Sequence, residues 1–326
     1  QFETMFRQLV IESENVYLNS NEHLRNNSEM ETREDRFIKK FKSDFPNHLI
    51  SRSAPIMHQI RSVKDPIEIQ LMQKACDITE KGFRRILGFI KKGIMEYEIE
   101  AELIHEFLRN RSNGFAYTPI IASGRSACVL HYIENNKSCN DKEVILMDFG
   151  AEYANYSSDL TRCVPVNGKF TKRQKEVYDA VLKVKKEATK LLKPGLLLNQ
   201  YHQMVGEIME KELVDLGLIS KNDILNQDPK WPAYKKYFMH GTSHYIGLDT
   251  HDLGSWKEPI KENMIFTVEP GIYIPEEGLG IRLEDDVVIQ KKGEPLNLMK
   301  NIPIESEEIE ELMNCLLYTS PSPRDA

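Results

Sequence analysis

The sequence has no long apolar segment, no clustered cysteines and no excess of positive charge, and each absence excludes a class of protein. A membrane-spanning helix needs about 20 mostly apolar residues in a row, and no segment of these 326 residues approaches that pattern. The 43 Lys and Arg residues against 50 Asp and Glu residues give a net charge of −7. Because phosphate binding requires a basic field, nucleic acid is not expected as the main partner.

Cysteine usage indicates the compartment. The five cysteines include no Cys-x-x-Cys pair, which argues against a disulfide framework and against a structural zinc knuckle. Such a spread fits a reducing compartment, and we expect a cytoplasmic protein.

Both ends of the chain resemble interruptions of a longer protein. The first residue is Gln1 rather than Met, and we expect much of an N-terminal domain, with any targeting signal, to be missing. Residues 315–326 resemble the translated read-through of a sequencing adapter, so we expect them to lie outside the fold.

Between these ends the length allows roughly two domains. Residues 1–60 are polar and would close only a small core alone, so we interpret them as the C-terminal remnant of an N-terminal α/β domain. Residues 61–314 form the main domain, and the boundary is expected between Arg61 and Pro66.

The main domain shows the same order of elements twice. Its first helix starts with Asp65 as N-cap and Pro66 at the first helical position, and its apolar stripe lasts until Lys92 and Gly93. A second helix begins near Glu96, and another helix pair follows later. The predicted helices and strands after Glu96 are, in order, strands at 117–122, 127–131, 144–149 and 158–166, helices at 171–193 and 199–216, a strand at 264–269 and a hairpin region at 272–289. Two helices followed by strands, twice, predict an α+β fold with an internal duplication whose halves enclose one site.

Residues 239–252 hold three of the nine histidines, at positions 240, 244 and 251. Gly241 and Gly247 loosen the backbone between them, so a regular helix is not expected. Any one of these histidines alone would more often be a surface residue or a satisfied core group. The cluster instead favours a metal site built from an irregular segment, because acidic residues elsewhere complete a ligand set.

Four carboxylates stand in apolar, strand-like surroundings: Asp148, Asp159, Glu269 and Glu284. Buried charges are costly unless they are paired or bind metal. Arg282 or a lysine could neutralise one or two of them, but four anions around one arginine would repel one another. Two divalent cations about 3.5–4 Å apart remove this conflict. With a single imidazole, the set suits manganese first, and zinc, cobalt or iron as alternatives. The predicted ligands are Asp148, Asp159, His244, Glu269 and Glu284.

At these residues the sequence resembles aminopeptidase P, the Xaa-Pro aminopeptidase. The resemblance covers about residues 61–313 and rests on seven segments in order: 130–135, 147–153, 158–162, 239–244, 250–252, 268–274 and 280–286. It implies a "pita-bread" catalytic domain with a dinuclear metal centre. By the same resemblance His131, His240 and His251 surround a proline-containing peptide substrate, while Tyr273 and Arg282 support the site. A core role for His131, and structural roles for Tyr273 and Arg282, remain alternatives.

The resemblance also implies a reaction and an assembly. A metal-bridging hydroxide attacks the carbonyl before proline, and Glu269 takes up and passes on its proton. The oxyanion sits against a metal and a histidine, either His251 or His240, and Asp148 or an open metal position holds the substrate amine. We expect a homo-dimer or homo-tetramer of the full-length protein.

Two other functions are alternatives for this sequence. Prolidase, an Xaa-Pro dipeptidase, shares the fold, the metals and most motifs, but it usually has Gly-Leu-Gly-His where residues 241–244 are Gly-Thr-Ser-His. Glu134 and Asn135 also favour aminopeptidase P. Metal-free pita-bread scaffolds form the second alternative, which is disfavoured because all five ligand positions are filled.

Overall fold

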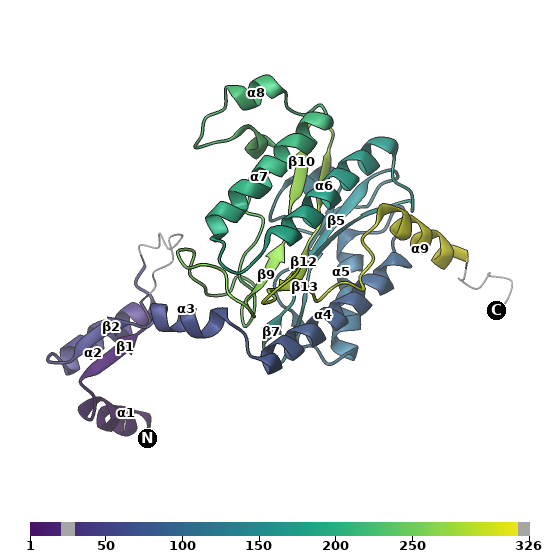
Figure 1. Ribbon diagram of the computed structural model, residues 1–326. Coiled ribbons are helices and arrows are strands. Elements are labelled where there is room, and N and C mark those ends of the chain that lie inside the picture. Colours follow the sequence, from purple (N-terminus) through teal and green to yellow (C-terminus); the bar gives the residue numbers. More distant parts are fainter. Residues whose placement is uncertain (21–29, 319–326) are drawn as a thin grey trace. The chain divides into compact units, whose positions relative to one another are not determined.

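The computed structural model describes residues 1–20 and 30–318, which divide into two compact units, Gln1–Arg61 and Ser62–Ala326 (Figure 1). The described part of the first unit has one parallel strand pair and three helices, the last of which ends at the boundary. These elements are β1 (Asn15–Leu18), β2 (Leu49–Arg52), α1 (Phe2–Ile11), α2 (Arg33–Asp44) and α3 (Ala54–Ser62). Its identity as a domain remnant stays a prediction.

The second unit opens with the helix pair α4 (Pro66–Leu87) and α5 (Glu96–Arg109). The predicted start of α4 is confirmed, since the Asp65 backbone N–H donates to Glu68 Oε2 at 2.7 Å. Its predicted end at Lys92 is wrong. The helix ends at Leu87, and the next apolar residues continue the stripe because they pack on the core from a turn, in which the N–H groups of Phe89 and Ile90 both donate to the Ile86 carbonyl.

Three antiparallel strands follow: β4 (Ile120–Ser123), β5 (Val144–Phe149) and β8 (Leu160–Pro165). Their register pairs Asp148 of β5 with Ile120 of β4 and with Thr161 of β8. Small strands lie beside them: β3 (Gly114–Phe115), β6 (Ala151–Tyr153) and β7 (Tyr156–Ser157).

The strand predicted at 127–131 is wrong. Residues Gly124–Cys128 form the 3-10 turn η1 instead, starting at a left-handed Gly124 with φ 55°. This turn packs across strand β11 (Leu279–Arg282), where a Cβ on Gly280 would lie 2.3 Å from the Ala127 carbonyl oxygen. A short apolar run cannot reveal whether it pairs with a strand or crosses one, and His131 therefore lies on an irregular segment.

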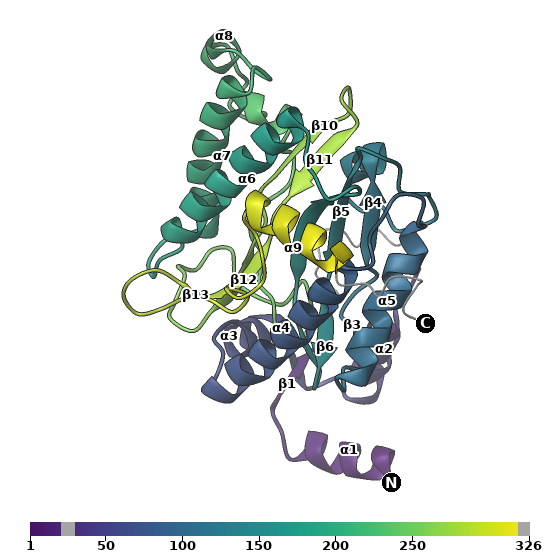
Figure 2. The ribbon, with the colours of Figure 1, turned by 90° about the vertical axis from the view of Figure 1, so that its right-hand side faces the viewer.

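The second helix pair is α6 (Lys172–Leu191), capped by Thr171 as predicted, and α7 (Leu198–Asp215). In both views α6 lies beside α7 and α4 beside α5 (Figure 2), and α4, α5 and α6 pack against the strands of the unit. The strands that follow α7 are β9 (Ile265–Val268), β10 (Gly271–Ile274), β11, β12 (Asp285–Val288) and β13 (Leu296–Asn297). β10 and β11 form the predicted hairpin, whereas β12 pairs with β9.

Residues 220–236, which follow α7, include the short helix α8 (Lys221–Leu225) and the turn η2 (Ala233–Lys236). The last helix is α9 (Ser306–Tyr318). It includes four residues of the segment 315–326, and the rest of that segment, 319–326, lies outside the described residues. Among the described helices, none is both long and apolar enough to cross a membrane.

Candidate metal centre

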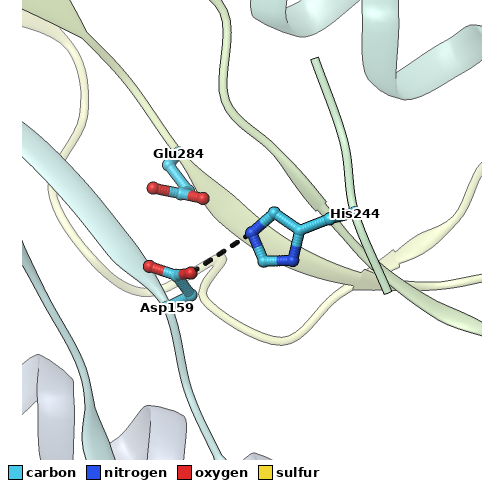
Figure 3. Close-up of side chains that lie close together, drawn as sticks. All are labelled: Asp159, His244 and Glu284. Carbon is cyan, nitrogen blue, oxygen red and sulfur yellow. Dashed lines mark ion pairs between the residues drawn. The ribbon is translucent and has the colours of Figure 1, made fainter. Parts of the chain in front are cut away.

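Three of the predicted ligands, from three separate segments, converge on one point (Figure 3). Asp159 stands immediately before β8, Glu284 lies between β11 and β12, and His244 comes from the irregular histidine segment. One ligand atom of each lies within 4.8 Å of the other two, and His244 Nε2 is 3.5 Å from Asp159 Oδ2. In the described part of the chain, this group has the composition and spacing of a metal site.

Backbone and hydroxyl contacts fix the two carboxylates. The Asp159 backbone N–H donates to Asp286 Oδ2 at 3.0 Å. The Glu284 N–H donates to the Thr161 carbonyl at 3.1 Å, and the Thr161 hydroxyl donates to Glu284 Oε2 at 2.5 Å. Both carboxylates are buried, with Asp159 4% and Glu284 2% exposed. The strands therefore hold both ligands on fixed supports.

The tautomer of His244 is set by its surroundings. Its Nδ1 lies 3.0 Å from the Tyr245 carbonyl, which can only accept, so Nδ1 carries the proton. Nε2 then faces the Asp159 and Glu269 carboxylates, at 3.5 and 3.6 Å. A backbone acceptor on one nitrogen is the usual way to prepare the other for a metal.

The remaining two predicted ligands border this group. Glu269 follows β9, and besides its contact with His244 its Oε2 is 3.7 Å from His240 Nδ1. Asp148 on β5 is linked to Asp159 through the half-buried Tyr117, whose hydroxyl lies between the two carboxylates. Asp148, Asp159, His244 and Glu269 are thus joined by direct contacts or by this one phenol, and Glu284 lies within 4.8 Å of Asp159 and His244.

Burial and crowding of like charge raise the pKa values of Asp159, Glu269 and Glu284. Burial raises the pKa of Glu284 well above its ordinary value, and Asp159 and Glu269 raise it further. Burial likewise raises the pKa of Glu269 to about 7. The pKa of His244 rises to about 9, because the Asp159 and Glu269 carboxylates outweigh the lowering effect of burial. The cluster is short of positive charge, which is the condition that a cation would relieve.

A hydrogen-bonded chain leads away from Asp148. Arg282 Nη2 donates to Asp148 Oδ2 at 2.5 Å, and Arg282 Nη1 donates to the Tyr273 hydroxyl at 2.9 Å. That hydroxyl is 2.8 Å from Nε2 of His240, whose Nδ1 is 2.8 Å from the Gly241 carbonyl. Burial, followed by the charge of Arg282, lowers the pKa of His240 to about 3. The neutral ring donates through Nδ1 and accepts from Tyr273 through Nε2.

The other two predicted histidines, His251 and His131, differ in how close they lie to the predicted ligands. The ring of His251 packs edge-on against His244, with centroids 4.4 Å apart. His131 is exposed, and it lies near enough to His240 to contribute to the lowering of its pKa.

The sequence interpretation did not identify Tyr117 or Asp286 as part of the site. Tyr117 precedes β4 and had been assigned only to a strand, and a phenol at the start of an apolar run carries no sequence signal of its own. Asp286 follows Glu284 by two residues and therefore lies on the same face of the chain, which was an available signal. One of its oxygens accepts from the Asp159 backbone, and the other, Oδ1, has no hydrogen-bond partner among the described residues.

A buried ionic network lies behind the ligands. Arg162 on β8 is fully buried and donates to Asp285 Oδ1 at 2.6 Å and to the Glu284 carbonyl at 2.7 Å. Lys185 of α6 contacts the other oxygen of Asp285. Burial alone would raise the pKa of Asp285, but these two cations hold it below its ordinary value. The network connects the strand after Asp159 to the residue after Glu284.

The chain is similar in sequence and in fold to known metallopeptidases. Residues 70–291 match the model of metallopeptidase family M24. The chain is 41% identical over 272 residues to the Xaa-Pro aminopeptidase of Haemophilus influenzae, covering 80% of this chain and 63% of that protein. It is 38% identical over 273 residues to the Xaa-Pro aminopeptidase of Escherichia coli, covering 79% and 61%. The fold is similar to that of zinc-substituted E. coli aminopeptidase P in complex with product, with a TM-score of 0.83 at 32% identity, covering 97% of this chain and 74% of that chain. The chain thus spans less than two thirds of the length of these two relatives.

Proposed function

Because this chain belongs to metallopeptidase family M24, we propose that it is a metal-dependent aminopeptidase that releases the first residue of peptides with proline in second position. The observation that carries the proposal is the convergence of Asp159, His244 and Glu284, with Nε2 of the histidine directed at carboxylates. The similarity to two Xaa-Pro aminopeptidases supports the choice of substrate.

The residues present fit a pair of divalent cations. Four carboxylates and one imidazole nitrogen would hold them, namely Asp148, Asp159, His244, Glu269 and Glu284. The shared burial of these carboxylates and the raised pKa values of three of them favour a site that needs positive charge. We assign manganese first, with zinc, cobalt or iron as alternatives, because the set has one nitrogen donor and no thiolate. When bound, such cations lower the pKa of water and polarise the carbonyl before proline.

The chain's own residues would handle the protons. Glu269 lies within 3.7 Å of both His244 and His240, so its carboxylate can accept a proton from attacking water and release it later. Proline nitrogen leaves only after protonation, and Glu269 can pass to it the proton that it has taken from water.

The developing oxyanion needs a donor. Both ring nitrogens of His240 already have partners, the Gly241 carbonyl and the Tyr273 hydroxyl. We assign the donor to His251 because its ring packs edge-on against that of His244. Exposed His131 is assigned to contact with the peptide at the rim, and the substrate amine to Asp148.

The pita-bread architecture and the duplication are part of the same proposal. The pair α4 and α5 precedes the sheet of β4, β5 and β8, and the pair α6 and α7 precedes the sheet of β9, β12 and β13. Ligands come from both halves, since Asp159 belongs to the first and Glu284 to the second.

Compartment and assembly complete the proposal. The five cysteines are all free, which supports the cytoplasm, a reducing compartment. We propose a homo-dimer or homo-tetramer for the full-length protein. Sedimentation of that protein as a monomer would contradict this assignment.

Hydrolysis of two matched peptides tests the function. Metal-stripped protein is assayed with Arg-Pro-Pro and with Gly-Pro, with and without added Mn²⁺. Metal-restored release of arginine from the tripeptide supports the aminopeptidase. Cleavage of the dipeptide alone would instead assign the chain as a prolidase, and inactivity of folded, metal-loaded protein on both peptides would contradict the proposal.

A further inference from the structure

A fully buried ion pair stands next to His251. Lys64 Nζ is 3.1 Å from Asp252 Oδ2, and the two side chains are 1% and 0% exposed. Removing both charges from water is expensive, and such a pair often stabilises a fold no better than apolar residues of similar size would. The cost of burying Lys64 and Asp252 therefore indicates that the pair has a role other than stabilising the fold.

The loop that carries His251 is folded around this pair. The Asp252 N–H donates to the Tyr245 carbonyl at 2.9 Å, and the Leu253 N–H donates to Asp252 Oδ1 at 2.7 Å. Gly247 is required here, because a Cβ at this position would lie 2.3 Å from Asp252 Oδ2 and 2.8 Å from Lys64 Nζ. The backbone before His251, at Gly247, and the backbone after it, at Leu253, thus both lie against the Asp252 carboxylate.

The other partner is tied to the strand of the active site. The Lys64 N–H donates to the Asn263 carbonyl at 2.9 Å, and Val63 forms a bridge with Met264. These residues lead directly into β9, which ends at Val268, one residue before Glu269. The ion pair consequently connects the loop of His251 to the strand that precedes a predicted ligand.

We propose that Lys64 and Asp252 are positioning residues for His251. The pair holds the loop so that the imidazole of His251 keeps its edge-on place, 4.4 Å from the ring of His244. Its contribution to turnover passes through His251. This inference rests on the proposed aminopeptidase function for its kinetic readout only.

The test variant is Lys64→Met with Asp252→Asn, which removes both charges at nearly constant volume. A single Lys64→Met change would remove a cation from the buried Asp252 carboxylate and would endanger folding. The matched control is Lys183→Met with Glu212→Gln, which neutralises an ion pair between α6 and α7, away from the site. Each variant of the full chain, loaded with Mn²⁺, is assayed on Arg-Pro-Pro.

We expect kcat to fall about 10- to 100-fold in the test variant, because small misplacements of catalytic groups cause losses of this size. KM should stay nearly unchanged, and the control variant should turn over at the wild-type rate. Within a His251→Ala background the same double change should have almost no further effect. Unchanged kcat in a folded test variant, or losses that multiply with His251→Ala, would overturn the proposal.

Hydrogen exchange separates this inference from the proposed function. If the wild-type chain cleaves neither peptide, the aminopeptidase assignment fails, and exchange at residues 247–253 decides the positioning role. Exchange at least tenfold faster in the test variant, with α6 unchanged, supports that role. Equal exchange in both proteins overturns it.

Discussion

Replacing Arg162 by methionine should destabilise the protein far more than the same change at Arg173. Arg162 is fully buried, and its guanidinium donates to three backbone carbonyls, of Thr161, Glu284 and Pro303, and to the Asp285 carboxylate. Methionine has similar length but can donate none of these bonds.

The expected loss in the free energy of unfolding depends on the hydrogen-bond partners that Arg162 leaves without a donor. Hydrogen bonds from a charged donor contribute about 1.5–3 kcal/mol each and do not add fully. Asp285 keeps Lys185 and Asn297 as partners, so its charge is not left alone. We therefore expect a loss of about 3–5 kcal/mol, the range for a broken buried pair. The free energy of unfolding of a domain is about 5–15 kcal/mol, so the variant would lose much of its stability. Its Tm should fall by about 6–20 °C.

The control has the same chemistry at the surface. Arg173 forms a two-pronged contact with Glu277, with side chains 34% and 35% exposed. Such pairs contribute about 0–1 kcal/mol. Urea unfolding of metal-stripped protein, followed by circular dichroism, measures both variants without a contribution from metal binding. A loss below about 1 kcal/mol for Arg162→Met, or equal losses for both variants, would refute the reasoning.

Three further predictions concern the site. Tyr117→Phe removes the hydroxyl between Asp148 and Asp159 and should weaken Mn²⁺ binding about 10- to 100-fold; calorimetry showing unchanged affinity would exclude this role. Gly150→Ala should impair folding or metal binding, because its Cβ would lie 1.7 Å from the Ser158 carbonyl oxygen, beside Asp159; normal thermal stability together with normal binding would contradict it. Mn²⁺ affinity should rise from pH 6 to pH 8. The pKa of Glu269 is raised to about 7 and that of His244 to about 9, so both residues hold protons at low pH that the metal must displace. An affinity that is flat or falls over this range would show that these groups are not ligands.

Much of the fold was accessible from the sequence because local signals and burial agreed. Asp65 with Pro66, and Thr171, are strong helix starts, and both helices begin where expected. The strand at 144–149 is confirmed because an apolar run of that length between turns suits a buried strand. Failures occurred where tertiary packing decides the conformation, as at 127–131, which crosses β11 as a 3-10 turn.

The candidate site was predicted less evenly. Carboxylates in apolar strands are costly, so Asp148, Asp159, Glu269 and Glu284 were conspicuous in the sequence. Tyr117 was not, because its role depends on the strand register that brings β4 beside β5. Nor could the sequence choose between His240 and His251 as the oxyanion donor. That choice depends on tertiary contacts, such as the hydrogen bond between His240 and the distant Tyr273.

Direct titration of metal-stripped protein with Mn²⁺, for the wild type and for Asp159→Asn, tests the central claim. Asparagine keeps the size of the side chain but removes the charge that faces His244 Nε2 at 3.5 Å. The proposal predicts that the wild-type chain binds Mn²⁺ and recovers cleavage of Arg-Pro-Pro, and that the variant, still folded, loses both together. Equal binding and full activity in the variant would contradict the assignment of this cluster as the metal centre.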